Sequence, residues 1–271
     1  MTTTNYSYAV RGQWAGPADE KPTVTGAKFL KTLDSLSGID PLFSGWQLYR
    51  NWQIAEDDQP RLVPLAKARN RIAEIVECGV ARDDFDEPTP GCGYTVCSTA
   101  GARGCRRVTF TVRTGNQFFD LSFGEYDSAS DLSIVTYPLF RGALLAISAA
   151  CEAPWGYAQA CRNDVVKVPI DVGPGVPAFR IDTALPVPLD PSFPKSIFHV
   201  PWIIYLSAKH AVGVTQAREI LTERTPDGGL LMSATTQRLD PTNPEHVRRA
   251  RILAEIMIAR TGHPPGGGAR S

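Results

Sequence analysis

The sequence lacks a surplus of charge of either sign. Its 28 Lys and Arg residues balance 28 Asp and Glu residues, so the formal net charge is zero. A general nucleic-acid binder or membrane-surface binder needs a basic surplus, so the balance argues against both classes. Long apolar runs are also missing, because the longest, Gly142 to Cys151, is far too short to span a bilayer. We therefore expect neither direct nucleic-acid binding nor membrane insertion.

The first twenty residues are polar and contain no apolar core, so we expect no export signal. The six cysteines are therefore expected to be reduced thiols in the cytoplasm. The gap between Cys92 and Cys97 is at the limit of zinc-binding patterns, and Cys105 completes only three ligands. Cys97 is better explained as a small apolar residue of a strand. We expect no metal and no cofactor.

Recognisable catalytic motifs are missing as well. The four histidines form no His-Glu-x-x-His pattern, and the sequence contains no Gly-x-Ser-x-Gly elbow. Paired carboxylates are frequent, but none has the apolar flanks that would raise a pKa. His199 precedes an apolar run and is better explained as a structural histidine. The sequence therefore predicts a protein that is not an enzyme, with a hydrolase that uses Cys97 or Cys105 with His199 as the alternative.

The apolar pattern that is present predicts an α+β fold, with a mainly antiparallel sheet and amphipathic helices packed on it. We expect one domain over residues 1–261, with a two-lobed arrangement as the alternative, and a disordered Pro/Gly-rich tail over residues 262–271. The expected strands include residues 6–14, 93–98, 107–114, 118–123, 165–170, 199–207 and 230–236. Short connections make the strands between residues 93 and 123 an antiparallel meander.

Helix signals divide the rest of the chain. Thr25 is expected to cap one helix, Pro138 to open another, and residues 65–76 to form a third. Residues 173–194 are rich in Pro and Gly, which predicts a long surface connection. Near the end, Asn243 fits a helix N-cap and Pro244 the first helical position. The helix that follows has one apolar face, so we interpret this last segment as scaffold.

Two acidic segments are the candidate partner-binding sites. The first contains Glu56, Asp57 and Asp58, and the second contains Asp83, Asp84, Phe85, Asp86 and Glu87. Such segments are most often solvated loops. The alternative is a patch that faces a basic partner, with Phe85 as an aromatic anchor inside a charged rim. Charge attraction there would accelerate the encounter more than it strengthens the complex.

Several segments together resemble the immunity protein 52 family of bacterial toxin–antitoxin pairs. Each segment is short, but their order and spacing follow the family from Tyr6 to Arg260, except in the long connection over residues 173–194. The segments are Arg11-Gly12-Gln13-Trp14, the helix into Leu36, Asp40-Pro41-Leu42-Phe43 with Trp46, Arg107 to Phe123, Trp202 with Tyr205-Leu206-Ser207, Gly229-Leu230-Leu231-Met232, and Arg238-Leu239-Asp240 followed by Asn243-Pro244-Glu245-His246-Val247.

The resemblance implies an α+β fold without catalysis. It also implies a cytoplasmic inhibitor that binds a cognate toxin, typically a nuclease of the restriction-endonuclease-like class delivered by type VI secretion. The matching tryptophans, turns and helix cap imply structural roles and assign no interface. A non-catalytic adaptor of a secretion system is a further alternative.

Overall fold

The computed structural model describes residues 2–17, 19–49, 62–78, 80–82, 88–98, 108–115, 117–123, 131–171, 177–182, 199–215 and 217–262. These residues form an α+β fold, as the sequence predicts. The strands are β1 (Thr2–Gln13), β2 (Gln47–Tyr49), β3 (Leu62–Pro64), β4 (Val80–Arg82), β5 (Pro88–Cys97), β6 (Val108–Arg113), β7 (Phe118–Phe123), β8 (Trp155–Asp171), β9 (Pro177–Asp182), β10 (His199–Leu206), β11 (Leu221–Arg224) and β12 (Leu230–Ser233). The α-helices are α1 (Pro22–Ser37), α2 (Leu65–Ala68), α3 (Ile72–Cys78), α4 (Tyr137–Cys151), α5 (Ala208–Ala211) and α6 (Pro244–Thr261), and short 3-10 turns cover Pro41–Phe43 and Arg69–Arg71.

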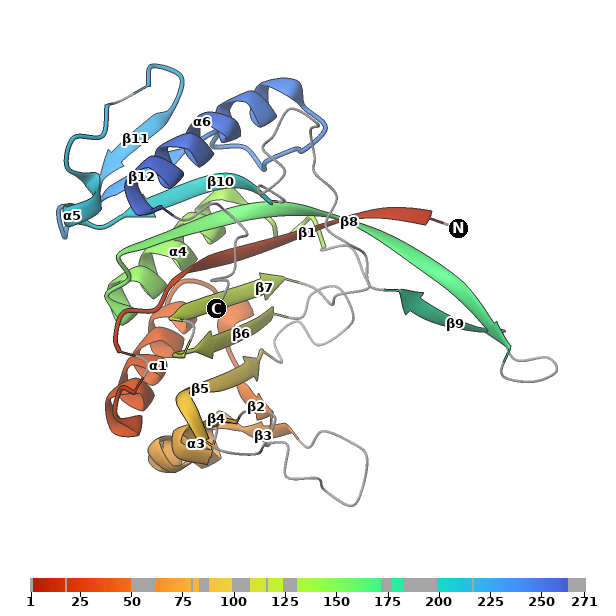
Figure 1. Cartoon of the computed structure of the whole chain (residues 1–271), viewed down its shortest axis with the longest axis vertical. Coiled ribbons are helices and arrows are strands. Elements are labelled where there is room, and N and C mark those ends of the chain that lie inside the picture. Colours follow the sequence, from red (N-terminus) through yellow and green to blue (C-terminus); the bar gives the residue numbers. More distant parts are fainter. Residues whose placement is uncertain are drawn as a thin grey trace.

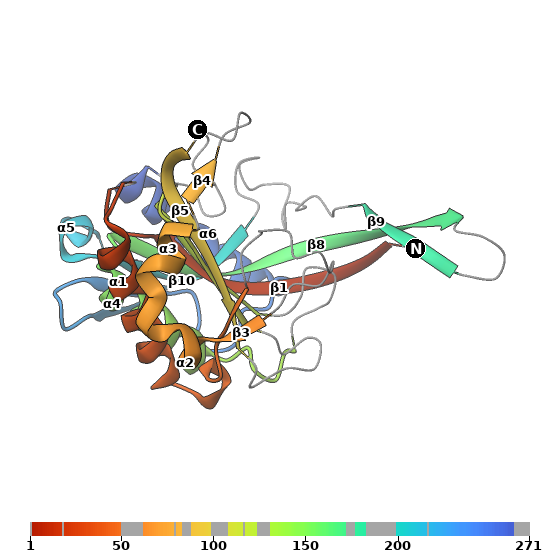
Figure 2. The same ribbon diagram turned by 90° about the horizontal axis from the view of Figure 1, so that it is seen from below.

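The described strands pair into one antiparallel sheet, in the order β11-β12-β10-β8-β1-β7-β6-β5-β2-β3. The predicted meander is present as β5, β6 and β7. The first strand, β1, lies in the middle of the sheet between β7 and β8. Both neighbours come from much later in the chain, so the centre of the sheet is held by long-range pairing. Beyond this body, β8 continues as a ribbon with β9 that projects outward (Figure 2).

Helices cover the two faces of the sheet unequally. Figure 1 shows α4 behind β8 and β1, and α6 in front of β10 and β12. On the α4 side, Phe140 stacks on Phe123 with ring centroids 4.4 Å apart and meets Trp202 at 5.4 Å. Further along the same face, Phe29 of α1 stacks on Phe110 at 5.8 Å. These aromatic rings pack α1 and α4 on one face of the sheet.

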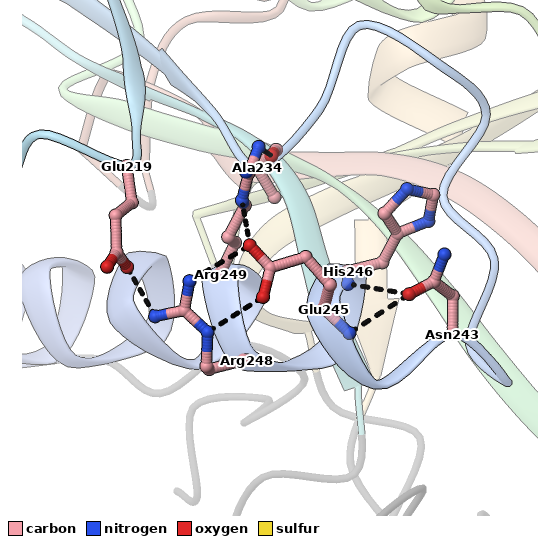
Figure 3. Close-up of polar contacts among 7 residues, drawn as sticks. All are labelled: Glu219, Ala234, Asn243, Glu245, His246, Arg248 and Arg249. Carbon is pink, nitrogen blue, oxygen red and sulfur yellow. Dashed lines mark hydrogen bonds and ion pairs between the residues drawn. The ribbon is translucent and has the colours of Figure 1, made fainter.

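The start of α6 is built as the sequence predicts. The Asn243 side chain accepts hydrogen bonds from the N–H groups of Glu245 at 2.9 Å and His246 at 3.4 Å (Figure 3). His246 Nδ1 in turn accepts the N–H of Asp240 at 3.1 Å, so this histidine has a structural role. Glu245 bonds both Arg248 and Arg249, and these hydrogen bonds lower its pKa to about 2. The cap and the charges therefore fix where the helix begins.

Two of the expected features are wrong. Thr25 does not cap α1, because the helix begins earlier, at Pro22, after Lys21. Proline suits the first helical turn, and Thr25 is buried within that turn and donates to Glu20 Oε2 at 2.8 Å. The predicted connection over residues 173–194 contains β9, because Pro177–Asp182 pairs with Val166–Asp171 of β8. The prolines of this segment argued against a strand in the sequence. Proline is tolerated at the edge of a sheet, and β9 pairs along only one described edge.

Asp227 in the β11–β12 turn gives the fold a dependence on pH. Burial opposes ionisation of this carboxyl, but hydrogen bonds from Thr225, Tyr205 and the Gly229 N–H outweigh it and lower its pKa below 3.8. The ionised form therefore stabilises the folded state above pH 3.8, and this stability is lost as the pH falls through the lowered pKa.

We expect Asp227→Asn to reduce the melting temperature at pH 6 by about 2 °C. The gap from the parent chain should begin to narrow near pH 3.8 and close as the pH falls through the lowered pKa, because both side chains are neutral below it. Circular dichroism melts over that range measure it, with the exposed Asp19→Asn as the control. A gap that persists unchanged at low pH would contradict the ionic origin.

Candidate interaction surface

The predicted acidic residues, Glu56 to Asp58 and Asp83 to Glu87, lie outside the described residues. The strands on either side of each segment are described. The first segment connects β2 with β3, and the second connects β4 with β5. The strands that precede the two segments, β2 and β4, both pair with β5. Leu48 of β2 lies opposite Val96, and Arg82 of β4 lies opposite Pro88. The two segments therefore leave the sheet from strands that flank β5.

The geometry argues against a Cys97–His199 pair. Cys97 is on β5 and His199 is on β10, and the strands β6, β7, β1 and β8 separate them. Five strand spacings of about 4.8 Å put the two backbones about 24 Å apart, far beyond hydrogen-bond reach. Cys105 lies outside the described residues. The hydrolase alternative therefore loses one of its two cysteines.

The cysteine spacing that resembled a zinc pattern has a different explanation in the strand. Cys92 and Cys97 are five residues apart on β5, so their side chains point to opposite faces of the sheet. Both side chains are buried, and Cys92 Sγ lies 3.3 Å from Thr114 Oγ1. Among the described residues no cluster of His, Cys, Asp and Glu could hold a metal ion. Cys97 is a buried residue of a strand, as the sequence predicts, although it shares the face of Thr95 rather than that of the buried Val96.

The side of the sheet opposite α1 and α4 presents a polar surface over β5, β6, β7 and β1. Cross-strand pairing places its residues in two rows, and we name the two rows together the open face. The outer row is Gln13, Phe118, Arg113 and Gly93, and the inner row is Arg11, Asp120, Thr111 and Thr95. Residues directly opposite each other in antiparallel strands share a face, so each row forms a line of neighbouring side chains.

Polar contacts hold the open face in one arrangement. Arg11 forms an ion pair with Asp120, with side chains only 23% and 12% exposed, and Ser122 donates to the same carboxylate. The Arg11 guanidinium also lies 6.0 Å from the centre of the Phe118 ring. Thr95 and Thr111 hydroxyls are 3.0 Å apart. These neighbours hold the side chains of the open face in place.

The outer row differs from an ordinary solvated sheet face in two residues. Phe118 is partly exposed although its neighbours are polar, and Arg113 beside it is exposed. No described carboxylate forms an ion pair with Arg113. The alternation of Thr109, Thr111 and Arg113 with buried Val108, Phe110 and Val112 was the sequence signal for this face. The sequence reasoning used that signal for the strand alone and missed the surface.

The open face adjoins the start of β5, the strand that follows the second acidic segment in the sequence. This strand begins at Pro88, three residues before Gly91. A Cβ atom at Gly91 would lie 2.4 Å from the Cα of Gly115 in the β6–β7 turn, so the two backbones are in direct contact. The Thr114 N–H also donates to Cys92 O at 2.9 Å. The early part of β5 and the β6–β7 turn next to the outer row are thus in direct contact.

A shallow hollow of about 380 Å³ lies between α1 and the end of α4. Its lining includes Val24, Lys28, Lys31 and Glu152. The Lys28 ammonium donates to Glu20 and to the carbonyl of Ala15, so its charge is already satisfied. The hollow contains no pair of groups arranged for acid–base or nucleophilic chemistry. It does not favour a small-molecule site.

Comparison with protein-family models gives no match, and comparison with curated proteins gives none. Among solved structures, a T6SS protein of Pseudomonas aeruginosa is similar over 96% of this chain and 77% of that chain, with 13% sequence identity and a TM-score of 0.48. This degree of likeness identifies neither a partner nor a reaction. The resemblance to the immunity protein 52 family stays a prediction. No described helix is long and apolar enough to cross a membrane.

Proposed function

We propose that this chain is a cytoplasmic immunity protein that binds a nuclease toxin and neutralises it by protein–protein association. The observation that carries the proposal is where the segments that resemble the immunity protein 52 family lie in the fold. Trp14, Phe43 and Trp202 are buried to 1% exposure or less, and Asn243 caps α6. The segments that carry the resemblance are therefore scaffold, as expected for a binding protein whose working residues lie in loops and on open surfaces.

The two acidic segments supply the charge that such a partner would attract. A nuclease needs a basic surface for its nucleic acid, and the carboxylates of the two acidic segments can meet that surface. Inhibition follows by one of two routes: the acidic segments cover the nucleic-acid site, or the protein binds elsewhere and prevents closure or oligomerisation of the toxin. The zero net charge favours the second route, because a mimic of nucleic acid is strongly acidic overall.

Co-expression with the product of the adjacent gene tests the proposal. We expect the adjacent product alone to arrest growth, and this chain to restore growth and to co-purify with it as a stable complex. Rescue of growth without a complex would point to another mechanism, such as the hydrolase alternative. A complex with a conserved secretion component in place of the toxin would instead favour the adaptor alternative.

Charge reversal tests the role of the second acidic segment. We expect Asp83→Lys, Asp84→Lys and Asp86→Lys together to weaken binding of the adjacent product at least about 10-fold, mainly through slower association at low salt. Stability should stay within about 0.5 kcal/mol, because loop charges contribute little to folding. Calorimetry and urea unfolding measure the two effects.

The matched control changes the net charge equally at exposed sites elsewhere, with Asp19→Lys, Glu152→Lys and Glu255→Lys. Equal weakening by both triple variants would mean that overall charge steers the encounter and that the segment makes no specific contact. Unchanged binding by the segment variant would remove the acidic-segment interface and leave the immunity function intact.

A further inference from the structure

We infer that the outer row of the open face is a docking surface for the protein partner, with Phe118 as its anchor and Arg113 as its charged neighbour. The inference rests on the proposed function, because it names where the same partner binds. It adds a site that the acidic segments do not include. The row lies on paired strands of the sheet, whereas the predicted acidic residues lie outside the described residues.

The composition of the row is that of a binding hot spot. Energetically important interface residues are enriched in aromatic side chains and Arg, surrounded by polar groups that exclude water. Phe118 is partly exposed between Gln13 and Arg113, and Arg11 lies over its ring. Gln13 is itself held by Gln117, since Gln13 Nε2 donates to Gln117 Oε1 at 3.1 Å. The anchor therefore sits in a fixed polar surround.

Continuity and charge indicate which partner occupies the row. The Gly91–Gly115 contact joins the row to the start of β5, the strand that follows the predicted acidic segment in the sequence, so a partner that contacts both would extend over the β6–β7 turn. Arg113 places an exposed cation beside Phe118 in the row. The partner surface should therefore present basic groups toward the acidic segment, and an apolar side chain next to a carboxylate toward Phe118 and Arg113.

Two variants in the full chain test the docking surface against the adjacent gene's product, purified in a catalytically inactive form. We expect Phe118→Ser to weaken binding about 30-fold and Arg113→Glu about 10-fold, measured by calorimetry. The control is Leu221→Ser, which removes an apolar side chain that is 47% exposed on β11 at the far edge of the sheet. That control should bind like the parent chain.

Arg113→Glu separates binding from folding, because the residue is exposed and its exchange leaves the core unchanged. Hydrogen exchange gives a second readout that needs no variant. We expect amides of residues 113–118 to gain protection in the complex, with those of β11 unchanged. Parent-like binding by both variants, without added protection at residues 113–118, would overturn the docking surface but not the immunity function. Failure of the parent chain to bind the adjacent product would overturn both.

Discussion

Replacing Trp202 with alanine is expected to lower the free energy of unfolding by about 4 kcal/mol. Trp202 is fully buried, and its ring meets Phe140, Tyr137 and Tyr8 at centroid distances of 5.4, 6.1 and 6.5 Å. Its indole N–H also donates to Thr235 O at 3.0 Å. Alanine removes the apolar contacts and leaves a cavity between α4 and the sheet. Urea unfolding followed by circular dichroism measures the loss.

Trp202→Phe separates packing from hydrogen bonding. Phenylalanine keeps most of the ring contacts but leaves the Thr235 carbonyl without its donor, which costs about 1–3 kcal/mol. We therefore expect an intermediate stability. A phenylalanine variant as unstable as the alanine variant would mean that the hydrogen bond, and not the ring packing, ties β10 to the connection before α6. Equal stability of alanine variant and parent would contradict the aromatic core described above.

The spacing of apolar residues was enough to predict much of this fold, because a helix or strand that is buried on one face has apolar residues at regular intervals, and a single sequence shows them. The α6 cap is an example, since Asn243, Pro244 and Glu245 act within three consecutive residues. The central position of β1 was not predictable in the same way. Its partners, β7 and β8, begin more than 100 residues later, and no local pattern encodes such pairing.

The candidate surface was predictable only in part, for a related reason. The acidic segments stand out in composition, so sequence alone selects them. Phe118 does not, because an aromatic residue in a strand is most often core, and Phe119 beside it is fully buried. Which of two adjacent phenylalanines lies on the open face depends on the register with β1 and β6. That register places Phe118 opposite Gln13 and Arg113.

Gly12→Val is expected to prevent stable folding, and Gly12→Ala to cost about 3 kcal/mol. Gly12 lies in the centre of the sheet within the Arg11–Trp14 segment. A Cβ there would lie 2.6 Å from the Phe119 ring and 2.7 Å from the carbonyl oxygen of Trp155. The ring is fully buried and the carbonyl belongs to the backbone of β8, so neither can move without disturbing β1, β7 and β8 together.

Gly93→Ala is the matched control for Gly12, because Gly93 is also a strand glycine in the same sheet. Its nearest neighbours to a Cβ atom are at 3.7 and 3.9 Å, an ordinary contact distance. Alanine there restricts the unfolded chain without a clash, so we expect stability to rise by about 0.5 kcal/mol. Thermal melts of the two alanine variants should therefore shift in opposite directions. If both alanine variants lost equal stability, the loss would be a property of strand glycines in general. The close approach of β1 to β7 and β8 would then not be the reason that glycine occupies position 12.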